Sequence, residues 1–184
     1  LNGHVDSHRI VWIGHSRGGE GVCRAYDRIF DGTYTPIRYA LSDIKLVSSI
    51  APTDFLGAAS ANPHAANYHL WVGGGDSDVD GCAASDIAMS YPLLQRSTGY
   101  HQSIELHGAG HGAFHAESTQ SEWQSGPCAV HRADVHAIMK PYLLPLVKRY
   151  VEDSIPAREF LWRPWESFQS PGVPTNSCVV VDLQ

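Results

Sequence analysis

The sequence has few positive charges and no run of lysine or arginine. Its 13 basic residues are outnumbered by 19 acidic ones, giving a formal net charge of −6. A protein that binds nucleic acid through charge carries a clustered basic patch, so we expect no nucleic-acid partner. Long apolar runs are lacking too. Stretches such as Ile10–Ile13 and Val179–Val181 fall far short of the roughly 20 residues of a membrane span, and no span is expected.

Cysteine is sparse, and no two cysteines have the close spacing of a zinc ribbon or a thioredoxin-type dithiol. The four are Cys23, Cys82, Cys128 and Cys178. They form either two disulfides or buried core thiols. Paired cysteines would favour secretion or a periplasmic location, because disulfides persist in oxidising compartments. The sequence by itself leaves the location unknown.

The remaining composition is typical of one globular domain, with 43% hydrophobic residues in a chain of 184. Short apolar runs predict buried strands, and spacings of three and four predict helices between them. The expected strands are 9–13, 44–50, 68–72 and 101–106, and the expected helices are 17–30, 83–97 and 130–153. Prolines in the last two helices should kink or interrupt them.

Strands that alternate with helices predict an α/β fold, with a mostly parallel sheet covered by helices on both faces. In such sheets functional residues gather at the carboxyl ends of the strands. The segment Gly14-His15-Ser16-Arg17-Gly18 lies at such an end and fits the G-x-S-x-G nucleophile elbow. Glycines are expected on both sides of the serine because this turn leaves no room for Cβ atoms.

A serine nucleophile needs a base and a group that orients the base. Asp76 and Asp78 directly follow the third expected strand, and His111 directly follows the fourth. The chain order serine, acid, histidine is the order of the α/β-hydrolases. Either aspartate could serve as the acid. A rival interpretation is a metal site of His107, His111 and His115, which the intervening glycines disfavour because they oppose a helix there. We expect neither a metal nor a cofactor.

Two further acidic residues lie near this edge. Glu20, one turn into the first expected helix, is either a favourable charge at the helix N-terminus or a buried partner for a histidine or arginine. We favour the helix-dipole interpretation. Asp54 follows the second strand and is interpreted as a turn former. His15, beside the serine, is expected to pack and hydrogen-bond within the elbow rather than act as a second base.

With these motifs the chain resembles the C-terminal half of an α/β-hydrolase catalytic domain, and its elbow resembles those of bacterial dienelactone-hydrolase-like and esterase-like members. The family's acid commonly follows as Gly-x-x-Asp-x-x-Val, here Gly73, Asp76 and Val79. The resemblance implies that Ser16 is the nucleophile, His111 the general base and Asp76 the orienting acid, with Asp78 as the alternative. It also implies that the backbone amide of Arg17 is one oxyanion donor.

The resemblance also implies strands and a second oxyanion donor ahead of the elbow, whereas Ser16 stands near the start of this sequence. We therefore expect a missing N-terminal half of the same protein, or a partner chain, to cover the sheet edge. Residues 1–155 are predicted to be the hydrolase half and 156–184 a Pro- and Trp-containing tail or linker.

The expected function is hydrolysis of a carboxylic ester through an acyl-enzyme. A lipase, peptidase, polyesterase or lactone hydrolase would use the same parts, so the substrate is not determined. The alternative is a non-catalytic binding or assembly protein that retains the hydrolase scaffold, or an inactive fragment of a longer enzyme.

Overall fold

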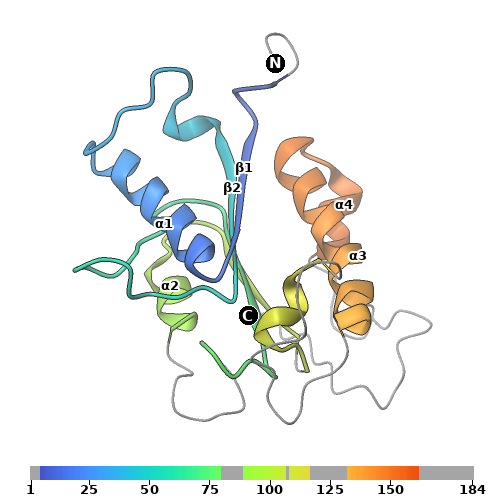
Figure 1. Ribbon diagram of the computed structural model, residues 1–184. Helices are drawn as coiled ribbons and strands as arrows, with labels where there is room; N and C mark the ends of the chain where they lie inside the picture. The colour runs from blue at the N-terminus through green and yellow to red at the C-terminus, as the bar shows by residue number, and fades with distance from the viewer. Residues whose placement is uncertain (1–4, 80–88, 107, 117–131, 162–184) are drawn as a thin grey trace.

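The protein is described here from a computed structural model, which covers residues 5–79, 89–106, 108–116 and 132–161. Its centre is a sheet of four parallel strands in the order β1-β2-β3-β4 (Figure 1). The strands are β1 (Ile10–His15), β2 (Ile44–Ile50), β3 (Tyr68–Gly73) and β4 (His101–Leu106). All four were predicted from the sequence within a residue or two at each end.

Helices cover both faces of the sheet, with α1 and α2 on one side and α3 and α4 on the other (Figure 1). The helices are α1 (Arg17–Phe30), α2 (Tyr91–Arg96), α3 (Arg132–Val151) and α4 (Ile155–Leu161), with short 3-10 turns η1 (Leu41–Asp43) and η2 (His111–Phe114). This arrangement confirms the predicted α/β class with a parallel sheet. No helix in the described ranges is long and apolar enough to cross a membrane.

The period-two alternation of the strands divides the core into two layers. Tyr68, Leu70 and Val72 of β3 pack toward α1 and α2. Trp71, from the same strand, packs toward α3 and α4. Its indole Nε1 donates a hydrogen bond to Ser48 Oγ at 3.2 Å, which satisfies the polar atom of a fully buried side chain. Burial of every residue of β3, on both faces of the sheet, explains why that strand is mostly apolar.

Two helices differ from expectation. Residues 83–88 of the predicted helix 83–97 lie outside the described residues, and α2 begins only at Tyr91, with Pro92 in its first turn. Proline is tolerated there because the first amides of a helix have no intrahelical acceptor. In α3, Pro141 and Pro145 stand inside one continuous helix rather than dividing it. Packing of α3 against the sheet outweighs the missing hydrogen bonds.

Helix α4 crosses the predicted boundary at residue 155, and its Leu161 is buried in the core layer beneath α3. The rest of the predicted tail, residues 162–184, lies outside the described residues, so the domain division stays a prediction. Cys23 is a buried free thiol, and burial raises its pKa to about 11. Cys23 therefore belongs to no disulfide, whereas the other three cysteines lie outside the described residues.

A fully buried histidine on β3 predicts acid sensitivity. Burial lowers the pKa of His69 to about 3, from an ordinary value of 6.5. Between these values the unfolded chain binds a proton that the native protein does not, so stability falls as pH falls through this window. At pH 4.5 the loss is about 3 kcal/mol relative to pH 7. Urea unfolding at both pH values should show a smaller loss for His69→Gln than for the parent, with exposed His101→Gln as the control. An undiminished loss in His69→Gln would contradict this.

Candidate active site

Ser16 occupies a strained turn between β1 and α1. Its backbone has φ 57° and ψ −124°, a region that residues with side chains seldom adopt. The turn is held in place because the Ser16 amide donates to the Ile50 carbonyl at 2.9 Å. The Ser16 carbonyl accepts from the amides of Gly19 and Glu20 at 2.9 and 3.2 Å. This is the geometry of a strand-to-helix elbow that presents a side chain at the carboxyl edge of a sheet.

The glycines of the elbow have different roles. A Cβ on Gly14 would lie 2.1 Å from the Gly18 carbonyl oxygen, so only glycine fits that position. A Cβ on Gly18 would meet no described atom within 4 Å, which makes the expectation of crowding on both sides wrong for Gly18. The second tight position is Gly19, where a Cβ would lie 3.0 Å from the Pro52 Cβ. Close packing of α1 against the segment after β2, residues 51–61, thus explains why glycine stands at position 19.

Asp76 and His111 form a buried pair at the same edge. Both side chains have 0% exposure, and His111 Nδ1 lies 2.7 Å from Asp76 Oδ2. The other Asp76 oxygen accepts the amides of Asp78 and Val79 at 2.7 and 3.1 Å. The carboxylate is therefore fixed by its own loop while it orients the imidazole. Because Nδ1 contacts Asp76, Nε2 is on the opposite edge of the ring.

Asp78, the alternative acid, lies on the other side of the same ring. Its Oδ2 is 3.5 Å from His111 Nε2, and its side chain is 34% exposed. An orienting acid must bind the nitrogen opposite the one that exchanges protons with the nucleophile. Asp76 is buried and contacts Nδ1 at 2.7 Å, whereas Asp78 adds negative potential near Nε2.

His15 joins the nucleophile elbow to the histidine turn. Its Nε2 donates to the backbone carbonyl of His111 at 3.1 Å, and the centroids of the two rings are 4.6 Å apart. Burial, followed by the neighbouring His111 and His115, lowers the pKa of His15 to about 4. His15 is thus a neutral donor near pH 7. Because Ser16 is its chain neighbour, this contact brings the elbow and η2 to one place.

Glu20 is a buried ion-pair partner, and the helix-dipole role that we favoured from the sequence is not its main role. Its carboxylate is fully buried and is the partner of Arg24, at 2.6 Å. It also accepts the Thr53 hydroxyl at 2.7 Å and the amides of Phe55 and Leu56 at 2.9 and 2.7 Å. Burial opposes ionisation, but these hydrogen bonds outweigh it and lower the pKa of Glu20. No local sequence signal indicates bonds to a loop more than 30 residues away.

Asp54 was expected only to form a turn, but its carboxylate also binds residues of other segments. One of its carboxylate oxygens accepts the Ala61 amide at 2.9 Å, and the other pairs with the Arg96 guanidinium at 2.5 Å. Arg96 Nε in turn donates to the Ala61 carbonyl at 2.7 Å. These bonds join the segment after β2 to α2. Residues 53–56 are therefore attached to α1 through Glu20 and to α2 through Asp54.

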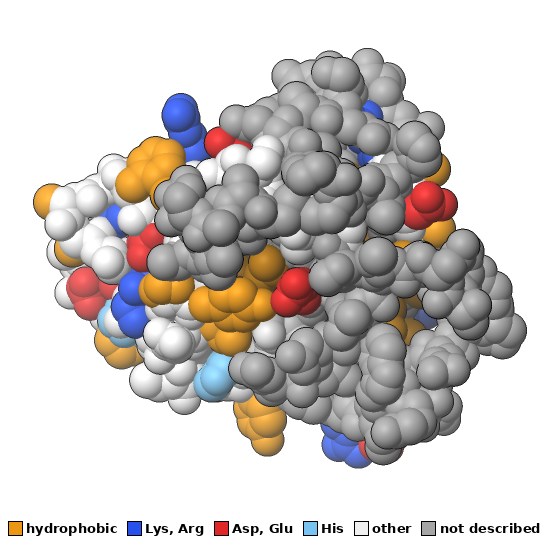
Figure 2. Space-filling model, turned by 90° about the horizontal axis from the view of Figure 1, so that it is seen from below, with side chains coloured by type: hydrophobic (Ala, Val, Ile, Leu, Met, Phe, Trp, Pro, Cys, Tyr) orange, Lys and Arg blue, Asp and Glu red, His pale blue; other side chains and the backbone are white. Residues whose placement is uncertain are grey.

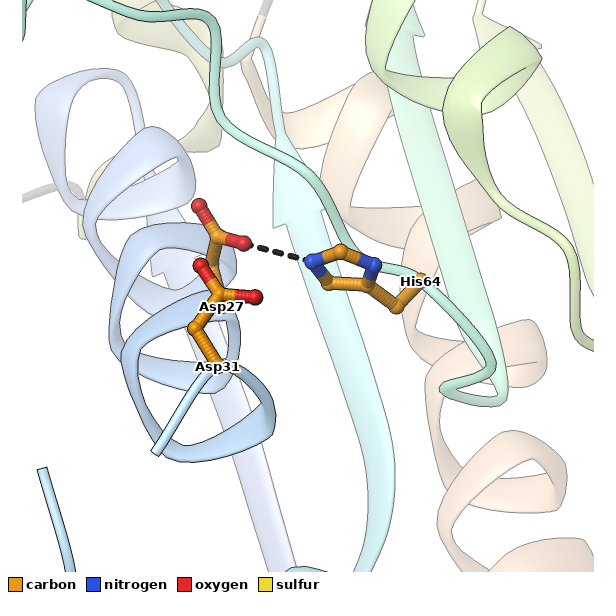
Figure 3. Close-up of side chains that lie close together, drawn as sticks. All are labelled: Asp27, Asp31 and His64. Atoms are coloured by element: carbon orange, nitrogen blue, oxygen red, sulfur yellow. Dashed lines mark hydrogen bonds and ion pairs between the residues drawn. The ribbon is translucent and has the colours of Figure 1, made fainter. Parts of the chain in front are cut away.

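The described part of the chain contains one group of three side chains with metal-ligand chemistry: Asp27, Asp31 and His64 (Figure 3). Their ligand atoms all lie within 4.8 Å of one another, and His64 Nε2 is 2.5 Å from Asp27 Oδ1. The donor set suits a divalent first-row metal. However, the Asp27–His64 ion pair already accounts for the contact, and the group lies at the end of α1 remote from Ser16. Of the predicted metal histidines, His107 lies outside the described residues.

The carboxyl-end face of the sheet carries apolar surface beside charge. Viewed from this end, hydrophobic side chains gather next to an acidic side chain and a histidine (Figure 2). Phe55 and Leu56, from the segment after β2, are 52% and 46% exposed. Their amides bind the buried carboxylate of Glu20, so this apolar surface lies beside the first turns of α1.

Comparison with known proteins supports the fold. No protein-family model and no curated protein matches the sequence. Among solved structures, the chain is similar to a ferulic acid esterase from Streptomyces cinnamoneus, with 17% identity and a TM-score of 0.54. The match covers 97% of this chain and 47% of that esterase, so the chain spans about half the length of its structural neighbour. At this identity the likeness shows a shared α/β fold.

Proposed function

We propose that this protein is a serine hydrolase that cleaves carboxylic esters through an acyl-enzyme, with Ser16 as nucleophile, His111 as general base and Asp76 as orienting acid. The observation that carries the proposal is the buried hydrogen bond between His111 Nδ1 and Asp76, at the edge where Ser16 stands in a strained turn. A structural neighbour named as a ferulic acid esterase supports the same reaction class.

In the proposed reaction, His111 Nε2 takes the Ser16 hydroxyl proton as Oγ attacks the ester carbonyl. The resulting oxyanion is stabilised by the Arg17 amide, which stands at the first position of α1 and so has no intrahelical acceptor. His111 then returns the proton to the leaving alcohol. His111 then takes a proton from a water molecule that attacks the acyl-enzyme, and it returns this proton to Ser16 Oγ as the acid is released. Asp76 keeps the imidazole in the required tautomer and stabilises its charged form.

A fluorophosphonate probe tests the proposal directly, because it forms a covalent bond only with an activated serine. We expect one label per chain, located on Ser16 by peptide mass spectrometry and absent in Ser16→Ala. Labelling should also disappear in His111→Ala, since an unassisted serine reacts poorly. A folded protein that takes up no label would favour the non-catalytic binding or assembly role instead.

We also propose a partner for strand β1. Among the described residues β1 pairs only with β2, and its Ile13 is 41% exposed. An unpaired apolar edge favours association, so a preceding segment of the same protein or another chain would cover it. That segment would also supply the second oxyanion donor. Light scattering of residues 1–184 expressed alone should show aggregation, and a monodisperse, fully active chain would refute this.

A further inference from the structure

The segment after β2 lies along the first turn of α1, close to the proposed nucleophile. The Thr53 amide donates to the Ser16 carbonyl at 3.3 Å, and the Thr53 hydroxyl donates to Glu20. Two successive amides, those of Phe55 and Leu56, donate to the two oxygens of the same Glu20 carboxylate. Because Glu20 is fully buried, these bonds are shielded from water and fix the backbone of residues 53–56.

This fixed backbone holds an aromatic ring beside the elbow. Phe55 is 52% exposed although it is apolar, and the Arg17 guanidinium lies 5.9 Å from the centre of its ring. Arg17 is the residue whose amide is the proposed oxyanion donor. Phe55 also lies two residues after Thr53, whose amide contacts the Ser16 carbonyl, so the ring is carried by the segment next to the proposed nucleophile. Phe55 belongs to neither of the two core clusters of the described residues, so its ring is available for contact with a ligand.

The position of Phe55 relative to His111 indicates which part of an ester, the acyl group or the alcohol, the ring would contact. The leaving alcohol must depart next to His111, which protonates it. His111 belongs to η2, which packs against α3 on one side of the sheet, whereas Glu20 and its loop lie on the α1 side. An acyl group that extends to the opposite side would run toward the α1 side of the sheet, where Phe55 lies.

From this geometry we infer that Phe55 forms the apolar wall of an acyl-group site that favours bulky aromatic acyl groups, and that Glu20 is the positioning residue that holds this wall. The inference rests on the proposed function. Arg17 contributes twice, through its backbone amide at the oxyanion and through its guanidinium beside the ring. A planar acyl group would stack on Phe55, a contact that a small acyl group such as acetyl cannot make.

Two esters with the same leaving group test the inference in the full protein: p-nitrophenyl benzoate and p-nitrophenyl acetate. Phe55→Ala should lower kcat/KM for the benzoate about 10-fold or more, mainly through KM, and change the acetate less than about 3-fold. Tyr34→Ala is the matched control. Tyr34 is an exposed aromatic ring 6.0 Å from the Arg28 guanidinium at the other end of α1, and its removal should change neither ester.

Glu20 is tested by two variants. Glu20→Gln, which keeps a carbonyl acceptor, should raise KM for the benzoate less than Glu20→Ala does, while Ser16 still takes the fluorophosphonate label. Equal losses for both esters in Phe55→Ala, or an unchanged benzoate preference, would overturn this inference while a labelled, active Ser16 keeps the proposed function. An unlabelled Ser16 with neither ester hydrolysed would overturn both. Phe55→Ala decides the matter if the Glu20 variants fail to fold.

Discussion

Replacing Ser16 by alanine is expected to lower kcat for ester hydrolysis about 10⁶-fold, because removal of the nucleophile costs nearly as much as removal of a whole triad. The fold should be unaffected, since alanine meets the same backbone strain at φ 57° as serine. Hydrolysis of p-nitrophenyl acetate measures the loss, and circular dichroism checks the fold. Activity within 10-fold of the parent would exclude Ser16 as the nucleophile.

Glycine at the same position separates chemistry from strain. Ser16→Gly should be as inactive as Ser16→Ala, yet more stable, because glycine adopts a positive φ without a Cβ clash. The expected gain in the free energy of unfolding is about 1 kcal/mol, the lower end of the cost of a strained residue. Chemical denaturation of the three proteins measures it. A less stable Ser16→Gly would show that the elbow stores no strain that glycine can relieve.

Replacing Asp76 by asparagine should lower kcat about 10⁴-fold, since an amide at this position favours the wrong tautomer of the histidine. Asparagine retains the Oδ1 acceptor for the amides of Asp78 and Val79, so the loop should keep its shape. The partner that changes is the atom 2.7 Å from His111 Nδ1. Steady-state kinetics measures the loss of kcat, and thermal unfolding checks the fold. If the unfolding temperature is unchanged, the loss of kcat is due to the altered contact with the imidazole.

Asp78→Asn is the matched control for that experiment. Asp78 is partly exposed and faces His111 Nε2 at 3.5 Å, so its neutralisation removes only a screened charge from the site. We expect kcat to fall less than about 10-fold. A larger loss for Asp78→Asn than for Asp76→Asn would reverse the assignment and make Asp78 the acid.

The sequence alone was sufficient for the strands, for the fold class and for the position of the elbow. Short runs with apolar and β-branched residues, each followed by glycine or proline within two residues, predicted β1 to β4, and the fully buried β3 is the most apolar of them. Apolar residues at helical spacing from Val22 to Ile29, with Asp31-Gly32 as the stop, predicted a helix over 17–30, which is the range of α1. These features are encoded locally, by periodicity and turn chemistry, and can be read without knowledge of the rest of the chain.

The tertiary structure decided which groups meet. Asp76 and Asp78 both directly follow β3, so their positions in the chain do not separate them. In the structure, Asp76 Oδ1 accepts the amides of the residues that follow it, and this leaves its other oxygen facing His111, 35 residues away. From the sequence, Glu20 was interpreted as a favourable charge near the N-terminus of a helix. In the structure its carboxylate binds the amides of the segment after β2. Hydrogen bonds between distant segments depend on how the elements pack, and no local pattern in a single sequence records that packing.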